Sequence, residues 1–222
     1  MQISNLQLFH LKESCKSNWT TDLADEILSR HPKHIQFLGL TEGDLSSLIE
    51  SLLYRFSSLG MTQRSQVFQL CLMALAVGGW FDRDPRFPSL EKLMRGEMPE
   101  SRRLAYFHIE VRKLVDKIWG PYGAESRIQQ MINSMEYDSR NAFPDLTSAG
   151  WVCDKINVSG FTAAGADRAS VLAPLTPVIG TMAMTDPVHG ELRRIVMQSS
   201  SRQDARLGII AELRRRQEVL AQ

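Results

Sequence analysis

The chain has few cysteines, and none is placed for metal or disulfide chemistry. Cys15, Cys71 and Cys153 lie far apart among the 222 residues, with no Cys-x-x-Cys pair and no histidine at zinc-ligand spacing. An odd number of widely spaced thiols is typical of free, mostly buried cysteines in a reducing compartment. We therefore expect neither a structural metal nor a disulfide framework.

Long hydrophobic runs and an excess of one charge are also absent. No stretch of about 18 residues is apolar throughout, and the first residues lack the basic start and apolar run of a signal peptide. The net charge is +1, so no overall field attracts nucleic acid or an anionic membrane. We expect a cytoplasmic protein that binds neither.

The common catalytic motifs are missing as well. The sequence contains no His-Glu-x-x-His, no Gly-x-Ser-x-Gly, and no lysine that would make a phosphate loop of its glycines. Asp82 and Asp84 could bind a divalent ion, and His108 lies near Glu110, so a small metal-dependent hydrolase is one alternative. Because Asp84 precedes a proline in a turn and Asp82 can cap backbone amides, we favour structural roles. We predict no catalytic residue, no metal and no cofactor.

Helical periodicity is what the chain does contain. Apolar residues recur three and four positions apart through most of its length, and residues 67–77 are apolar nearly all round, which predicts a central, buried helix. Pro32 is predicted to end the first helix, Thr41 and Thr62 to cap the next two, and Pro99 to lie in the first turn of a fourth.

The second half of the chain has a weaker pattern. Glycine and proline at 120–123 predict a boundary between a helical domain, 1–120, and a C-terminal region, 121–222. Residues 141–185 are predicted to be irregular, with a hairpin or packed loops around Trp151 and Phe161. Further helices are expected over 124–137, 187–198 and 200–221. The fold class is thus mainly α: a multi-helix orthogonal bundle with a mostly helical, less regular C-terminal part.

Arginine is frequent near the C-terminus. Residues 187–222 contain seven arginines and four acidic residues. They could contact phosphate or an acidic protein surface, but the interleaved acids favour a solvated face of i,i+4 pairs.

Helix-breaking residues occur at both ends of Gly78–Pro88, which reads GGWFDRDPRFP. Its two glycines release the preceding helix, and its prolines fix the exit from the loop. Aromatic and arginine side chains beside charges are typical of interface anchors. We therefore take five residues as the candidate partner-binding set: Trp80, Phe81, Asp82, Asp84 and Arg86.

Residues 36–117 resemble a family of small helical proteins encoded beside type VI secretion effectors in Gram-negative bacteria. The resemblance lies in the Gly-x-x-Phe-Asp-x-Asp-Pro-x-x-Pro pattern of Gly78–Pro88. It extends to Gly60-Met61-Thr62, Leu72-Met73, Leu93 and Arg102-Arg103-Leu104. The chain differs at Ser89, where a tryptophan often follows the last proline. Residues 121–222 resemble nothing that we recognise.

The resemblance implies a non-enzymatic partner of a secreted toxin. One implied role is an immunity protein that neutralises a cytoplasmic toxin, such as a nuclease; the other is an accessory chaperone that loads the effector. The unmatched region 121–222 would then suit recognition of the particular toxin.

Overall fold

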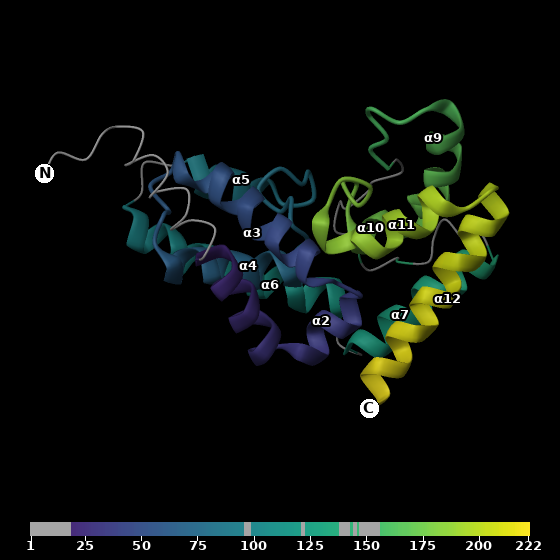
Figure 1. Ribbon diagram of the computed structural model, residues 1–222, viewed down its shortest axis with the longest axis horizontal. Helices are drawn as coiled ribbons and strands as arrows, with labels where there is room; N and C mark the ends of the chain where they lie inside the picture. Colours follow the sequence, from purple (N-terminus) through teal and green to yellow (C-terminus); the bar gives the residue numbers. More distant parts are fainter. Residues whose placement is uncertain (1–18, 96–98, 121–122, 138–142, 144–145, 147–155) are drawn as a thin grey trace, which may run out of the picture.

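The computed structural model describes residues 19–95, 99–120, 123–137, 143, 146 and 156–222, and every regular element in these ranges is a helix (Figure 1). A helix over 19–30 comes first. It is followed by α2 (Pro32–Leu38), α3 (Glu42–Ser57), α4 (Arg64–Val77), α5 (Pro88–Arg95), α6 (Glu100–Trp119), α7 (Gly123–Tyr137), α9 (Ala163–Ala169), η1 (Ser170–Leu175), α10 (Thr176–Ile179), η2 (Pro187–His189), α11 (Gly190–Gln198) and α12 (Arg202–Ala221). The predicted mainly α, multi-helix bundle is confirmed. No helix in the described part of the chain combines the length and the hydropathy that a membrane crossing requires.

The central helix of the first half is α4, which packs against α3 and α6. Half of its side chains are buried, including most of those from Leu70 onward, and Leu70, Cys71 and Ala74 are fully enclosed. Burial raises the pKa of the Cys71 thiol to about 12, so this free cysteine stays protonated. Cys15 and Cys153 lie outside the described residues.

The predicted helix start at Thr41 is confirmed, whereas the one at Thr62 is wrong. The Thr41 amide donates to the Asp44 carboxylate at 2.9 Å, and the Asp44 amide donates to the Thr41 hydroxyl at 3.2 Å, which is a capping box. The next helix begins one residue later than expected. Its N-cap is Gln63, whose amide donates to the side-chain oxygen of Gln66 at 2.9 Å.

Helix α2 is not predicted by the sequence pattern. The helix before it ends at residue 30, and Pro32, predicted only as a terminator, is the first residue of α2. Proline fits there because the first amides of a helix have no intrahelical acceptor. The other end of α2 is held by α12: Arg215 donates to the carbonyl of Gln36 at 2.8 Å, and Arg216 to that of Leu38 at 3.2 Å.

These contacts correct the prediction of a solvated arginine face on α12. Arg216 is buried and pairs with buried Glu212, with 2.8 Å between Arg216 Nε and Glu212 Oε1. The predicted i,i+4 pairing is therefore present at these two residues, but it lies inside the protein.

The described part of the segment predicted to be irregular contains three short helices: α9, η1 and α10. Pro174 lies inside η1, α10 ends before Gly180, whose φ is 84°, and alanine and glycine give α9 little periodicity. Residues 156–161 form no strand, so a hairpin is absent there, and Trp151 lies outside the described residues.

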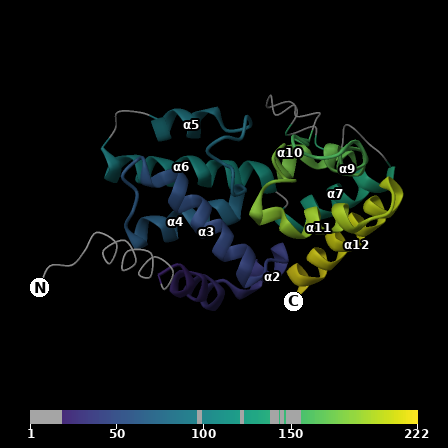
Figure 2. The same cartoon turned by 45° about the horizontal axis from the view of Figure 1, so that its top comes forward.

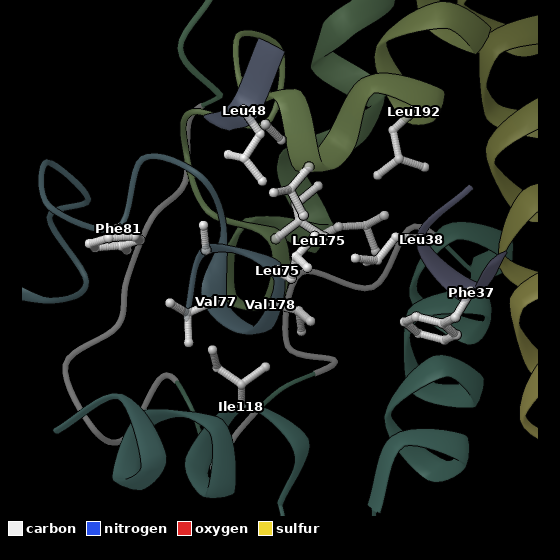
Figure 3. Packing of buried hydrophobic residues seen from close by; sticks show 14 of the residues in the cluster. Phe37, Leu38, Leu48, Leu75, Val77, Phe81, Ile118, Leu175, Val178 and Leu192 are labelled. Carbon is white, nitrogen blue, oxygen red and sulfur yellow. The ribbon is translucent and has the colours of Figure 1, made fainter. Parts of the chain in front are cut away.

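The two halves of the chain meet in a shared core. Figure 3 shows Leu175, Val178 and Leu192 of the second half gathered with Leu75 and Val77 of α4. Further links are the contacts of α12 with α2 and of η2 with α3. Residues of α6 and of α7 also belong to this one core.

Three aromatic rings form the centre of the first half. The rings of Phe56 and Phe81 are 5.7 Å apart, those of Phe81 and Phe107 are 5.1 Å apart, and each side chain is at most 1% exposed. Such pairs add to the free energy of burial.

We expect Phe107→Ala to lower the free energy of unfolding by about 3–5 kcal/mol, because the lost ring leaves a cavity that the rigid surroundings cannot close. Tyr54→Ala is the matched control, since that ring is 85% exposed. Urea denaturation followed by circular dichroism measures both. Equal losses in the two variants would contradict this view of the core.

Candidate partner-binding site

The predicted site, Gly78–Pro88, consists of the loop between α4 and α5 together with the first residue of α5; we call it the motif loop. It leaves α4 at Gly78, whose φ of 109° is strained for any residue with a side chain. The Asp84 side chain accepts the Arg86 amide at 2.9 Å, which makes a local turn around Pro85. The predicted roles of the glycines as a helix exit and of Asp84 in a turn are confirmed.

Asp186 fastens the start of the motif loop to the second half of the chain. The Gly79 amide donates to both Asp186 carboxylate oxygens, at 2.9 and 2.8 Å, and the Val188 amide donates to Oδ1 at 2.9 Å. A Cβ on Gly79 would lie 2.7 Å from Oδ1, so only glycine allows this approach. The carboxylate is buried.

Arg55 of α3 holds the middle of the loop. Its guanidinium donates to the Asp82 carboxylate and to the Gly79 carbonyl, and it lies 4.4 Å from the ring centre of Trp80. The Trp80 indole donates in turn to the Thr185 carbonyl at 3.1 Å. Trp80 is therefore fixed from both sides, by a cation–π contact and by a hydrogen bond.

Asp84 and Arg86 form a buried, bidentate ion pair at the end of the loop. Arg86 Nη2 lies 2.8 Å from Asp84 Oδ2, and Arg86 Nε lies 3.0 Å from Asp84 Oδ1. Arg86 also donates to the carbonyl of Val178 at 2.7 Å. A Cβ on Gly180, whose φ is 84°, would lie 2.5 Å from Asp84 Oδ2. The pair thus fills a space that the second half of the chain leaves free for it.

The motif loop is therefore an internal connection between the two halves. Phe81, Asp84 and Arg86 are buried, so the prediction that these three bind a partner is not supported by their positions. Trp80 and Asp82 keep partial exposure, and Arg55 contacts both. The aromatic and charged residue types that suggested an interface anchor instead satisfy one another inside the fold.

The three residues of the hydrolase alternative have separate partners. Asp82 pairs with Arg55, Asp84 with Arg86, and His108 contacts the Gln69 side chain at 3.3 Å. Within the described residues, no group of three His, Cys, Asp or Glu side chains could hold a metal ion.

The residues that hold the motif loop were not found by sequence reasoning. Asp186 stands 107 positions from Gly79, and Arg55 stands 27 positions from Asp82. The Asp186-Pro187 dipeptide is a recognisable helix start, and Asp186 does cap η2. Nothing in that local signal identifies the distant amide that it also binds.

The exposed surface offers a different candidate along the seam of α7 and α12, which pack side by side (Figure 1). A groove of about 400 Å³ is lined there by residues including Glu136, Arg206, Leu207 and Arg214; we call it the α7–α12 groove. Leu207 is 55% exposed. Arg206 donates to the Met135 carbonyl at 2.6 Å, and Arg214 to the Glu136 carboxylate at 2.6 Å. The groove therefore combines an exposed apolar side chain with arginines held in fixed positions.

We expect Arg86→Met to lower the free energy of unfolding by about 3–5 kcal/mol, because Asp84 would become an unpaired buried charge. Arg83→Met is the matched control: its side chain is 63% exposed and its Nε lies 3.9 Å from Asp82. This control should lose less than about 1 kcal/mol. Chemical denaturation tests the pair, and similar losses would show that the buried ion pair is not a structural requirement.

The pH dependence of stability should show the titration of the buried Asp186 carboxyl. Burial raises the pKa of its carboxyl from 3.8 to about 6, although the amides of Val188, Gly79 and Trp80 favour the ionised form. Between these two values the folded state keeps a proton that the unfolded state has lost. Its contribution to the free energy of unfolding is therefore greatest below pH 3.8, falls as pH rises to about 6, and is constant above.

Asp186→Asn removes this titration. The stability difference, native protein minus variant, should fall between pH 4 and about pH 6 and then level off, as measured by urea denaturation across pH. Burial also lowers the pKa of His189 to about 3, but that contribution is shared by both proteins and cancels in the difference. A difference that does not vary with pH would contradict the assignment.

Comparisons with known protein families, curated proteins and solved structures find no match to this chain. The resemblance to proteins encoded beside type VI secretion effectors therefore rests on the sequence motif alone. The structure adds that this motif is the connection between the two halves of the fold.

Proposed function

We propose that this protein is an immunity protein that binds and neutralises a type VI secretion toxin acting in the cytoplasm, such as a nuclease. The sequence resemblance of residues 36–117 supports the proposal. Inhibition would proceed by direct binding, with the active site of the toxin covered or its assembly blocked.

The surface that we choose for toxin binding is the α7–α12 groove. Leu207 is exposed beside Arg206 and Arg214, and both arginines are held by contacts at the end of α7. Apolar and arginine side chains in a hollow are the usual anchors of protein interfaces, and side chains already fixed lose less entropy on binding. Tyr137, at the end of α7, is 77% exposed and extends this surface.

The groove also lies within 121–222, the region without any resemblance. Removing that region would not test binding cleanly, because it carries Asp186 and the carbonyl that accepts from Arg86. Point variants on the exposed surface leave those internal contacts intact.

We expect cells that express the toxin encoded by the neighbouring gene to survive when the native protein is co-expressed. Leu207→Glu should abolish survival and weaken pull-down of the toxin at least tenfold, because a charge replaces the apolar anchor. Tyr54→Glu is the matched control: it introduces the same charge at an exposed position on α3 and should leave survival unchanged.

The outcomes separate the possible roles. Pull-down of the effector without any protection would favour a loading chaperone, whereas neither binding nor protection would refute the proposal. Full protection by the Leu207→Glu variant would support the immunity function but would show that the toxin binds outside the groove.

A further inference from the structure

Helix α6 has a second face that no described element covers. Seven of its exposed residues lie on one side of the helix, since six of them stand 3, 4, 7, 10, 11 and 14 positions after the first. We call this the α6 outer face; it consists of Arg102, Ala105, Tyr106, Ile109, Arg112, Lys113 and Asp116. Tyr106 is 51% exposed and Ile109 is 52% exposed. Large apolar side chains at the centre of an exposed stripe are typical of an interface.

The opposite face of α6 is fully used by the fold. Phe107, Val111 and Ile118 are buried there, and α6 packs against α4, α5 and α7. Figure 2 shows α6 between α5 and α4. The exposed stripe is thus a separate surface on a rigid, 20-residue helix.

The order of side chains along this face is self-complementary. Ile109 lies at its centre, with Arg102 seven positions before it and Asp116 seven positions after it. Tyr106 and Arg112 lie three positions to either side. When two such helices run antiparallel and cross at Ile109, the two Ile109 side chains meet and each Arg102 faces Asp116 of the other copy.

We propose that the α6 outer face joins two copies of this chain in an antiparallel pair centred on Ile109. This goes beyond the proposed inhibition of a toxin and does not depend on it.

The charges on the face support a second copy as the partner. The side chains of Arg102, Arg112 and Asp116 make no hydrogen bond or ion pair with the described part of their own chain, so all three are available. Antiparallel pairing gives each Arg102 the carboxylate of Asp116 from the other copy. A parallel pair would instead set Arg102 against Arg102 and Asp116 against Asp116, which fixes the direction.

The area of the α6 outer face sets the expected affinity of dimerisation. Stable dimers bury roughly 800 Å² on each partner, and a helix of 20 residues is about 30 Å long. One helix face supplies less than that area by itself. We therefore expect a dimer that dissociates at micromolar concentrations, with sedimentation equilibrium showing a concentration-dependent mass.

Cysteine cross-linking tests the symmetry of the pair. Ile109→Cys places two thiols at the two-fold axis, so mild oxidation should join the two copies through a disulfide. Ala105→Cys is the matched control: its two copies would lie about 12 Å apart along the helices, too far for a disulfide. Both variants carry serine in place of Cys15 and Cys153, whereas buried Cys71 is retained.

Charge exchange distinguishes a second copy from any other partner. Arg102→Asp alone sets two carboxylates against each other and should weaken dimerisation at least tenfold; Asp116→Arg should do the same with two guanidinium groups. The double variant recreates the ion pair between copies and should recover dimerisation. A different, acidic partner would not be recovered by that exchange.

Two results would overturn the proposal. One is a native protein that stays monomeric at millimolar concentration, and the other is equal cross-linking of Ile109→Cys and Ala105→Cys. Circular dichroism of each variant shows that the helical fold is kept, which is expected because all the substituted positions on α6 are exposed.

Discussion

Arginine hydrogen bonds to the carbonyl groups at helix ends are the interaction on which this fold depends. The last carbonyls of a helix have no intrahelical donor, and several helices here end against another part of the protein. In each case an arginine from a different element donates to them. The pairs are Arg86 with Val178, Arg127 with Ile118, Arg168 with Val196, Arg206 with Met135, Arg215 with Gln36 and Arg216 with Leu38.

Arginine suits this role because it is always charged and carries five donors on a long side chain. It can reach a carbonyl on another helix while its remaining donors bind a carboxylate, as Arg86 does with Asp84 and Arg216 with Glu212. The cationic guanidinium also favours the negative end of the helix dipole. This accounts for the arginine content of the C-terminal region better than binding to phosphate, because Arg206, Arg215 and Arg216 are already engaged.

The sequence could predict the elements of this fold but not the connections between them. The capping pattern at Thr41 and the apolar run 67–77 are local signals, and the structure confirms both. Helix α2 lacks such a signal because it is short and its end is satisfied by α12. The contact between Gly79 and Asp186 spans 107 positions, so no periodicity or spacing could reveal it. The aromatic and charged residues of the motif loop indicated a binding site because buried ion pairs and interface anchors use the same residue types.

The buried position of the motif loop limits what can be inferred when another protein shares its sequence pattern. Gly79, Asp84 and Arg86 each make contacts that a different side chain would break. Proteins that share this pattern would therefore share the connection between two helical halves, whatever they bind. Leu207 and Ile109 are under no such restriction, because both are about half exposed and neither completes a buried hydrogen bond. Recognition of a particular partner can thus change at the surface while the motif loop stays the same. The motif accordingly bears on the fold, and the exposed helix faces are free to vary with the partners that we propose.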